Sequence, residues 1–272
     1  MSYFDEETLY PAAREQKPPV QISPVFGAMV AATAFAGLLT YRGGISEPLT
    51  TLVFVLFVVG GWMISLSLHE FGHALAAYWG GDKSVVHKGY LTLNPFNYTH
   101  ASYSIVLPLL YLAMGGIGLP GGAVYINMGA IRSKAKRSLT SAAGPMATAI
   151  CALILLLPFI IGLPRDEMFR HSNFWAGIAL LAFLQLTGLL FNLLPIPGFD
   201  GWGILEPALP RSTAQSARLM GRFSMLIILV VFMSNNPVSR GFWQWVMLLG
   251  SVFRLNFALV SEGLRLFRFW MP

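Results

Sequence analysis

Two histidines and a glutamate lie close together in the sequence, as His69-Glu70-Phe-Gly-His73. Side chains four positions apart share one face of a helix, so both imidazoles can bind a single metal ion. Glu70, between them, is then placed to act as a general base toward a water molecule. This spacing predicts the chemistry of zinc-dependent peptide hydrolysis.

The segment before these residues is strongly apolar. From Leu49 to Leu68 the sequence contains no Asp, Glu, Lys or Arg, and about 20 apolar residues suffice for a helix to cross a bilayer. Ionisable side chains beside lipid are energetically expensive, and they usually mark a functional site. The alternative is that His69, Glu70 and His73 form a polar helix face packed inside a bundle.

The composition indicates an integral membrane protein. Hydrophobic residues make up 55% of the 272 residues and charged residues only 11%, against about 25% charged in soluble domains. The sequence pI of about 9.6 does not predict nucleic-acid binding, because the basic residues are scattered among the loops between apolar runs. Cys151 is the single cysteine, so a metal must be bound by His, Asp or Glu.

The distribution of apolar runs predicts an all-α, polytopic membrane protein with about six transmembrane helices. A re-entrant or β-hairpin-like segment is expected at 104–119, between the second and third helices, because this run is shorter than a full span. Residues 1–24 read as a cytoplasmic tail, and 25–272 as one membrane-embedded domain with a catalytic core at about 49–206. The expected spans are 25–41, 49–79, 139–163, 174–194, 223–233 and 242–253.

Basic residues predict the orientation. With a cytoplasmic N-terminus and a re-entrant 104–119, most of the 18 Lys and Arg residues lie inside, as the positive-inside rule expects. That arrangement also puts the C-terminus in the cytoplasm. The cytoplasmic residues then include Arg254, Arg265 and Arg268, and those outside are Arg42, Arg165, Arg170 and Arg240.

A catalytic zinc site needs a third protein ligand and an open fourth position. No further histidine follows His73 at the spacing that metzincins use. Asp200 is the best acidic candidate, because it follows Pro195 and Pro197 where an apolar helix ends. Broken backbone at membrane depth occurs where it is buried in protein or lines a cavity. The alternative is that Asp200 is simply a turn residue.

Three motifs together resemble the site-2 protease family of intramembrane metalloproteases, over roughly residues 49–206. They appear in the family's order and lie within or between apolar runs. The motifs are His69-Glu-Phe-Gly-His73, Ala143-Gly-Pro-Met-Ala-Thr148 and Asn192-Leu-Leu-Pro-Ile-Pro-Gly-Phe-Asp200-Gly.

The resemblance implies that one Zn²⁺ per chain is bound by His69, His73 and Asp200, with Glu70 as the general base. It implies a core of three helices, from the runs 49–79, 139–163 and 174–194, with the metal a short way in from the cytoplasmic side.

It also implies a substrate-positioning role for Asn192, Gly144 and Thr148, although each is also explained by helix packing or capping. Two positions depart from the family pattern. Thr148 stands where such proteins usually carry Asn, and Trp202 where they usually carry a second Gly.

The expected function is therefore hydrolysis of peptide bonds within or next to transmembrane segments, as in regulated intramembrane proteolysis. The expected partners are a single-span membrane protein as substrate and the lipid bilayer, with homo-oligomers or adaptors left open. We expect a multi-pass protein of a prokaryotic inner membrane. Two alternatives remain: a non-proteolytic membrane partner with a structural metal site, and a transporter that uses broken helices.

Overall fold

The structure is a computed structural model, and it describes residues 19–98, 124–221 and 236–270, together with Ser224, Val231, Phe232 and Ser234. All regular elements in these parts of the chain are helices. Four helices are long and apolar enough to cross a membrane: α1 (Pro24–Arg42), α2 (Glu47–Gly80), α5 (Lys134–Ile161) and α7 (Ser172–Asn192). A bent pair, α11 (Pro237–Val252) and α12 (Phe257–Phe267), brings the number to five if it is one broken span.

The first four predicted spans are thus present, with ends that differ by a few residues. The six predicted spans are not all found, because most of the run 223–233 lies outside the described residues and 242–253 belongs to the bent α11–α12 pair. Helix α12 was not predicted. The segment 104–119, expected to be re-entrant, also lies outside the described residues.

Short helices connect the long ones. They are α3 (Ser84–His87), η2 (Pro95–Asn97), α6 (Arg165–Arg170), α8 (Asp200–Leu205), η4 (Glu206–Ala208) and α9 (Arg211–Gly221).

Capping residues explain several helix ends. Ser23 precedes Pro24, and its hydroxyl accepts a hydrogen bond from the Phe26 N–H at the start of α1. Helix α2 ends at Gly80, and the following Gly81 has φ 125°, a conformation that only glycine adopts without strain. The Gly80-Gly81-Asp82 segment therefore ends α2 within one residue of the predicted end of the span 49–79.

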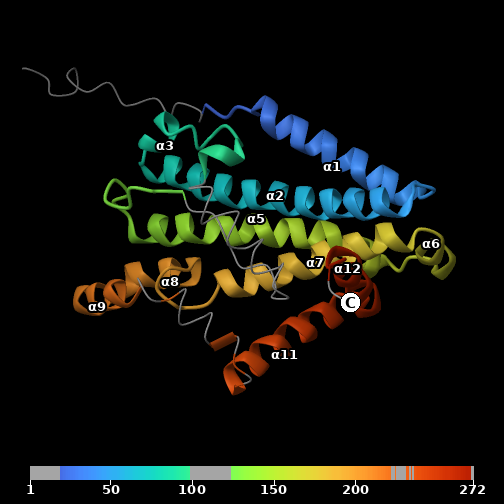
Figure 1. The fold of residues 1–272 in the computed structure, drawn as a ribbon. Coiled ribbons are helices and arrows are strands. Elements are labelled where there is room, and N and C mark those ends of the chain that lie inside the picture. Colours follow the sequence, from blue (N-terminus) through green and yellow to red (C-terminus); the bar gives the residue numbers. More distant parts are fainter. Residues whose placement is uncertain are drawn as a thin grey trace, which may run out of the picture.

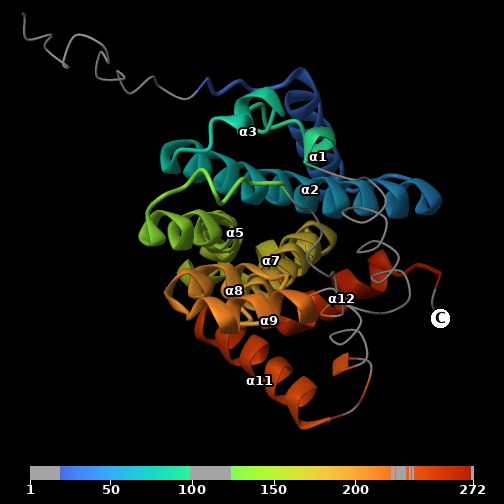
Figure 2. The same cartoon turned by 90° about the vertical axis from the view of Figure 1, so that its left-hand side faces the viewer.

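Helices α2, α5 and α7 pack on one another and form the centre of the bundle (Figures 1 and 2). Helix α7 is the most buried of the long helices. Glycine allows close approach of α2 and α5, since a Cβ at Gly72 would lie 2.7 Å from the carbonyl oxygen of Ala143. The expected three-helix core is therefore present.

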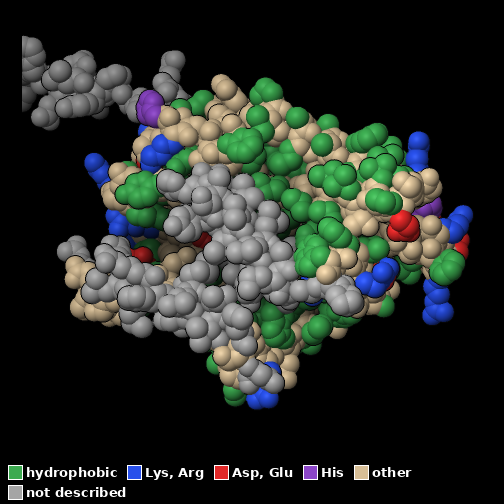
Figure 3. Space-filling view, viewed as in Figure 1, with side chains coloured by type: hydrophobic (Ala, Val, Ile, Leu, Met, Phe, Trp, Pro, Cys, Tyr) green, Lys and Arg blue, Asp and Glu red, His purple; other side chains and the backbone are tan. Residues whose placement is uncertain are grey.

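The outer surface of the bundle suits a bilayer. Figure 3 shows hydrophobic side chains over the middle of the visible face and Lys and Arg mostly toward the two ends of the long helices. On α5, large exposed apolar residues recur at helical spacing and form a lipid-facing stripe. The members of this stripe are Leu139, Met146, Ile150, Leu153, Leu157 and Ile161.

The long helices run antiparallel, so α2 ends where α5 begins; we call this the Lys134 end and the opposite one the Arg165 end (Figure 1). At the Lys134 end, Lys88 Nζ donates to the Tyr125 carbonyl at 2.7 Å. Asp82 Oδ2 accepts from the Asn127 N–H, also at 2.7 Å. The chain therefore leaves the described structure at residue 98 and re-enters it at residue 124 at the same end of the bundle.

The C-terminal part lies toward the Arg165 end. Arg254 Nη1 donates to the carbonyl of Ile160, near the end of α5. Phe267 packs in one apolar cluster with Ala36 and Val53, and Gly263 lies against the carbonyl of Ala176 near the start of α7. These contacts place Arg254 and the end of the described chain nearer the Arg165 end, after a bend of 118° between α11 and α12. The predicted membrane side of the C-terminus stays a prediction.

Candidate metal centre

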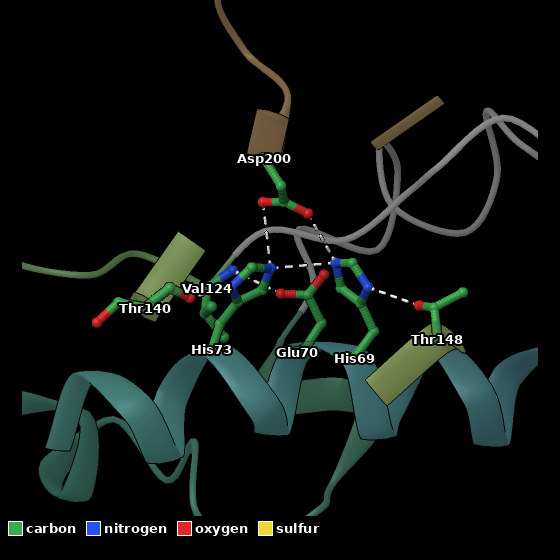
Figure 4. A network of polar contacts seen from close by, with 7 residues as sticks. All are labelled: His69, Glu70, His73, Val124, Thr140, Thr148 and Asp200. Carbon is green, nitrogen blue, oxygen red and sulfur yellow. Dashed lines mark hydrogen bonds and ion pairs between the residues drawn. The ribbon is translucent and has the colours of Figure 1, made fainter. Parts of the chain in front are cut away.

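Three side chains from two distant parts of the chain converge on one point (Figure 4). Nε2 of His69 lies 3.2 Å from Oδ2 of Asp200, and Nε2 of His73 lies 3.2 Å from Oδ1 of the same carboxylate. The two Nε2 atoms are 3.1 Å apart. Two imidazole nitrogens and a carboxylate that face one point can together bind a cation. The predicted ligand set is thus brought together.

These distances fit zinc. Ligand atoms bound tetrahedrally at about 2.0–2.1 Å from Zn²⁺ are separated from one another by roughly 3.3 Å. The observed separations of 3.1 and 3.2 Å are close to that value. Two histidines and one carboxylate are also a donor set that catalytic zinc sites use, with a fourth position left open. The arrangement therefore fits a zinc ion, and these three residues could hold it.

Helix α5 orients both imidazoles through their other ring nitrogens. Nδ1 of His73 lies 2.7 Å from the backbone carbonyl of Thr140, so it carries the proton and donates. Nδ1 of His69 lies 2.8 Å from the hydroxyl of Thr148. Each contact directs the Nε2 lone pair toward the metal position, as the outer hydrogen bonds of zinc-binding histidines do.

Gly144 makes room for the two histidine rings. A Cβ at this position would overlap Nε2 of His73 and lie 2.7 Å from Nε2 of His69. Any larger residue at position 144 would therefore displace the two histidine rings. The neighbouring Pro145 lies inside the helix, where it lacks an N–H and leaves one carbonyl of the preceding turn without its helical donor.

A tight connection after α7 places Asp200 over the histidines. Gly198 has φ 103°, and a Cβ at Gly201 would overlap the carbonyl oxygen of Leu193, so both positions favour glycine. Ser138 of α5 donates to the carbonyl of Ile204 at 2.7 Å and anchors α8.

Glu70 points into the same site without binding the metal position. Its side chain is only 3% exposed. Its Oε2 accepts a hydrogen bond of 3.0 Å from the backbone N–H of Val124, in the segment that follows the undescribed residues (Figure 4). A carboxylate held beside a metal site, and outside its ligand set, is positioned for proton transfer.

The site lies inside the apolar part of the bundle, close to the Lys134 end. At 1.5 Å per residue, His69 is about 30 Å along α2 from Leu49, which equals the hydrocarbon thickness of a typical bilayer. Gly144 lies about 8 Å along α5 from Leu139, the first apolar residue after the basic start of that helix. The metal position is therefore near one end of the apolar part of the bundle.

The structure also locates the remaining predicted residues. Gly144 and Thr148 contact the histidines, as described. Asn192 lies half-buried at the end of α7, without a hydrogen bond from its side chain to any described residue. Sequence reasoning missed the Thr140 carbonyl and the Val124 N–H. Both are backbone groups, so no residue type could have indicated them.

A buried centre of two histidines and a carboxylate, set in long apolar helices, defines a membrane-embedded metalloenzyme. The chain is 42% identical over 261 residues to "Putative zinc metalloprotease Rip2" of Mycolicibacterium smegmatis, covering 94% of this chain and 97% of that protein. The protein of the same name from Mycobacterium tuberculosis H37Rv is 42% identical over 257 residues, covering 94% and 96%. "Putative zinc metalloprotease YwhC" of Bacillus subtilis is 27% identical over 197 residues, covering 69% and 83%.

The chain therefore belongs to the site-2 protease family and is a zinc metalloprotease of the membrane. No family model and no solved structure matches it.

Proposed function

We propose that this protein is an intramembrane endopeptidase that hydrolyses peptide bonds within or next to transmembrane segments of other membrane proteins. The observation that carries this proposal is the position of Glu70. Its carboxylate is buried between the two zinc-binding histidines and takes no part in the ligand set. A structural zinc site has no use for such a base, and its coordination is usually closed by four protein ligands.

His69, His73 and Asp200 would hold the zinc ion, which would supply the acidification of a water molecule and the polarisation of the scissile carbonyl. Glu70 accepts the proton as the water attacks, and delivers it to the leaving amine when the peptide bond breaks. The N–H of Val124 holds one carboxylate oxygen of Glu70, which leaves the other oxygen for the proton. Thr148 and the carbonyl of Thr140 keep the histidine rings fixed during these steps.

The depth of the site suggests the substrate class. A transmembrane helix satisfies its amides internally, so a peptide bond reaches the zinc only after that helix unwinds locally. Gly or Pro near the cleavage site would lower the cost of unwinding. A single-span membrane protein that enters from the bilayer is therefore the proposed substrate, cut close to one membrane face. Release of its soluble part is what regulated intramembrane proteolysis requires.

We further propose that the Lys134 end faces the cytoplasm, in the inner membrane of a prokaryotic cell. Six basic residues lie close to that end, where α2 stops and α5 begins. They are Lys83, Lys88, Arg132, Lys134, Lys136 and Arg137. The positive-inside rule assigns such a cluster to the cytoplasmic side. The relatives named above come from bacteria.

The test compares newly formed N-termini in membranes of cells that express wild type or Glu70→Gln. This variant keeps the size of the side chain and removes the base. We expect a set of cleavages inside or beside transmembrane segments that disappears in the variant, while both proteins bind one zinc per chain. Identical maps from two zinc-loaded proteins would contradict the proposal and favour a non-proteolytic partner. Zinc-independent function of His69→Ala would favour a transporter.

A further inference from the structure

A cavity of about 240 Å³ opens at the Lys134 end, beside the metal centre. One wall is the start of α5, with Lys134, Arg137 and Ser141, and the other is formed by Gly203 and Glu206 of α8 and η4. Met128, Pro207, Leu209 and Ala214 complete the lining. The cavity thus combines two cations and one carboxylate with apolar sides.

The cavity adjoins the catalytic residues on both walls. Ser141 directly follows Thr140, whose carbonyl orients His73. Gly203 lies three residues after the zinc ligand Asp200, about 4.5 Å along the helix. A Cβ at Gly203 would lie 2.5 Å from the Ser141 hydroxyl oxygen, so the walls meet one turn away from the metal. The cavity therefore lies on the Lys134 side of the metal position.

Its electrostatics favour an anion. Lys134 and Arg137 are three residues apart and share one face of α5. Both stand in the first turn, where the helix dipole is positive and where α5 has no acidic residue. Arg137 uses Nε to donate to the carbonyl of Ile131 at 2.6 Å. Within the described residues its terminal nitrogens and the Lys134 ammonium have no other partner, so they can bind a carboxylate.

We propose that this cavity is a substrate subsite that takes an acidic side chain, Asp or Glu, located toward the Lys134 end of the scissile bond. The inference rests on the protease function proposed above. From Gly144, which lies against both zinc-binding histidines, to Arg137 is about 10 Å along α5. At about 3.3 Å per residue of extended peptide, the acidic residue lies roughly three positions from the cut. Because the cavity borders the metal site, it suits a substrate side chain better than a lipid headgroup.

The test is a comparison of cleavage-site maps from membranes of cells that express the full chain. Wild-type sites that depend on Glu70 should be enriched in Asp or Glu two to four residues from the cut, on one side. In Lys134→Gln/Arg137→Gln this enrichment should disappear. In Lys134→Glu/Arg137→Glu it should shift to Lys or Arg. In one purified single-span substrate, the acidic residue at that position is changed from Asp to Asn. This change should lower the kcat/KM of the wild-type enzyme about fivefold, as expected for one exposed ion pair. It should leave the kcat/KM of the double Gln variant unchanged.

Arg132→Gln is the matched control, because Arg132 is an exposed cation two residues before Lys134 that does not line the cavity; it should retain the enrichment. Arg137→Lys, which keeps the charge, should retain most of it. Thermal unfolding of each purified variant excludes a folding defect.

Glu70-dependent cleavages without acidic enrichment would overturn the proposed subsite and leave the proposed protease function standing. No Glu70-dependent cleavage at all would overturn the protease itself. In nanodiscs, the double Gln variant could instead lose the same share of kcat/KM on every substrate, and only when anionic lipid is present. That result would replace the subsite with a phospholipid headgroup site.

Discussion

The hydroxyl of Thr148 lies 2.8 Å from Nδ1 of His69, and both side chains are buried. The residue that departs from the family's usual Asn is therefore in contact with a predicted zinc ligand. From this position, we expect Thr148 to hold one imidazole in the orientation that zinc requires.

Thr148→Val removes this hydrogen bond and keeps the shape of the side chain. We expect zinc affinity or cleavage rate to fall by about 10- to 100-fold, the usual effect of losing an outer hydrogen bond at a zinc site. Zinc affinity is measured by competition with a chelator, and Thr148→Ser should recover most of it. Thr187→Val is a matched control, because this buried threonine donates only to the Phe183 carbonyl within α7. Equal zinc affinity in Thr148→Val and wild type would show that Thr148 does not orient His69.

Gly144→Ala adds a single methyl group against the two histidine rings. Because both rings are fixed through Nδ1, they cannot rotate away without losing a hydrogen bond. We expect the purified variant to contain little zinc by elemental analysis while its helical circular dichroism stays near that of wild type. Gly188→Ala is the control, since a Cβ there meets nothing within 4 Å. A full zinc content in Gly144→Ala would contradict the observed packing of α5 against the site.

Removal of zinc should lower stability, because the metal binds only the folded arrangement that brings Asp200 to the histidines. At zinc concentrations of about 1,000 times Kd, binding contributes about 4 kcal/mol. A chelator should therefore lower the Tm of the wild-type protein in detergent. In His73→Ala, which lacks one ligand, the same chelator should leave Tm almost unchanged. A matching decrease in both proteins would mean that the chelator acts elsewhere.

Cysteine labelling tests the orientation. In a Cys151→Ala background, we place single cysteines at Lys136, Arg170 and Phe269, all exposed in the structure. A membrane-impermeant thiol reagent added to intact cells should label positions 170 and 269 and should label 136 only after lysis. Labelling of position 136 in intact cells would reverse the proposed orientation. Labelling of position 269 only after lysis would restore the cytoplasmic C-terminus that the charge distribution predicted.

Much of this protein could be predicted from local patterns. Uncharged runs of spanning length identified α1, α2, α5 and α7, because lipid tolerates few other sequences. The four-residue spacing of His69 and His73 predicted a shared helix face, since it depends only on helix geometry. The Pro-Gly break before Asp200 indicated a chain that leaves the helix at membrane depth. Each of these inferences depends on residues that are neighbours in the sequence.

The tertiary structure decided what depends on contacts between distant segments. Asp200 could be confirmed as a partner of His69 and His73 only once α7 and α8 were packed against α5. The Thr140 carbonyl and the Val124 N–H act through the backbone, whose role no residue type encodes. The placement of α12 toward the Arg165 end follows from a bend at Phe253–Asn256 and from packing on α7, which charge counting along the chain does not detect. Sequence alone determined the chemistry and the membrane setting, and long-range packing determined how α5 and α8 complete the site.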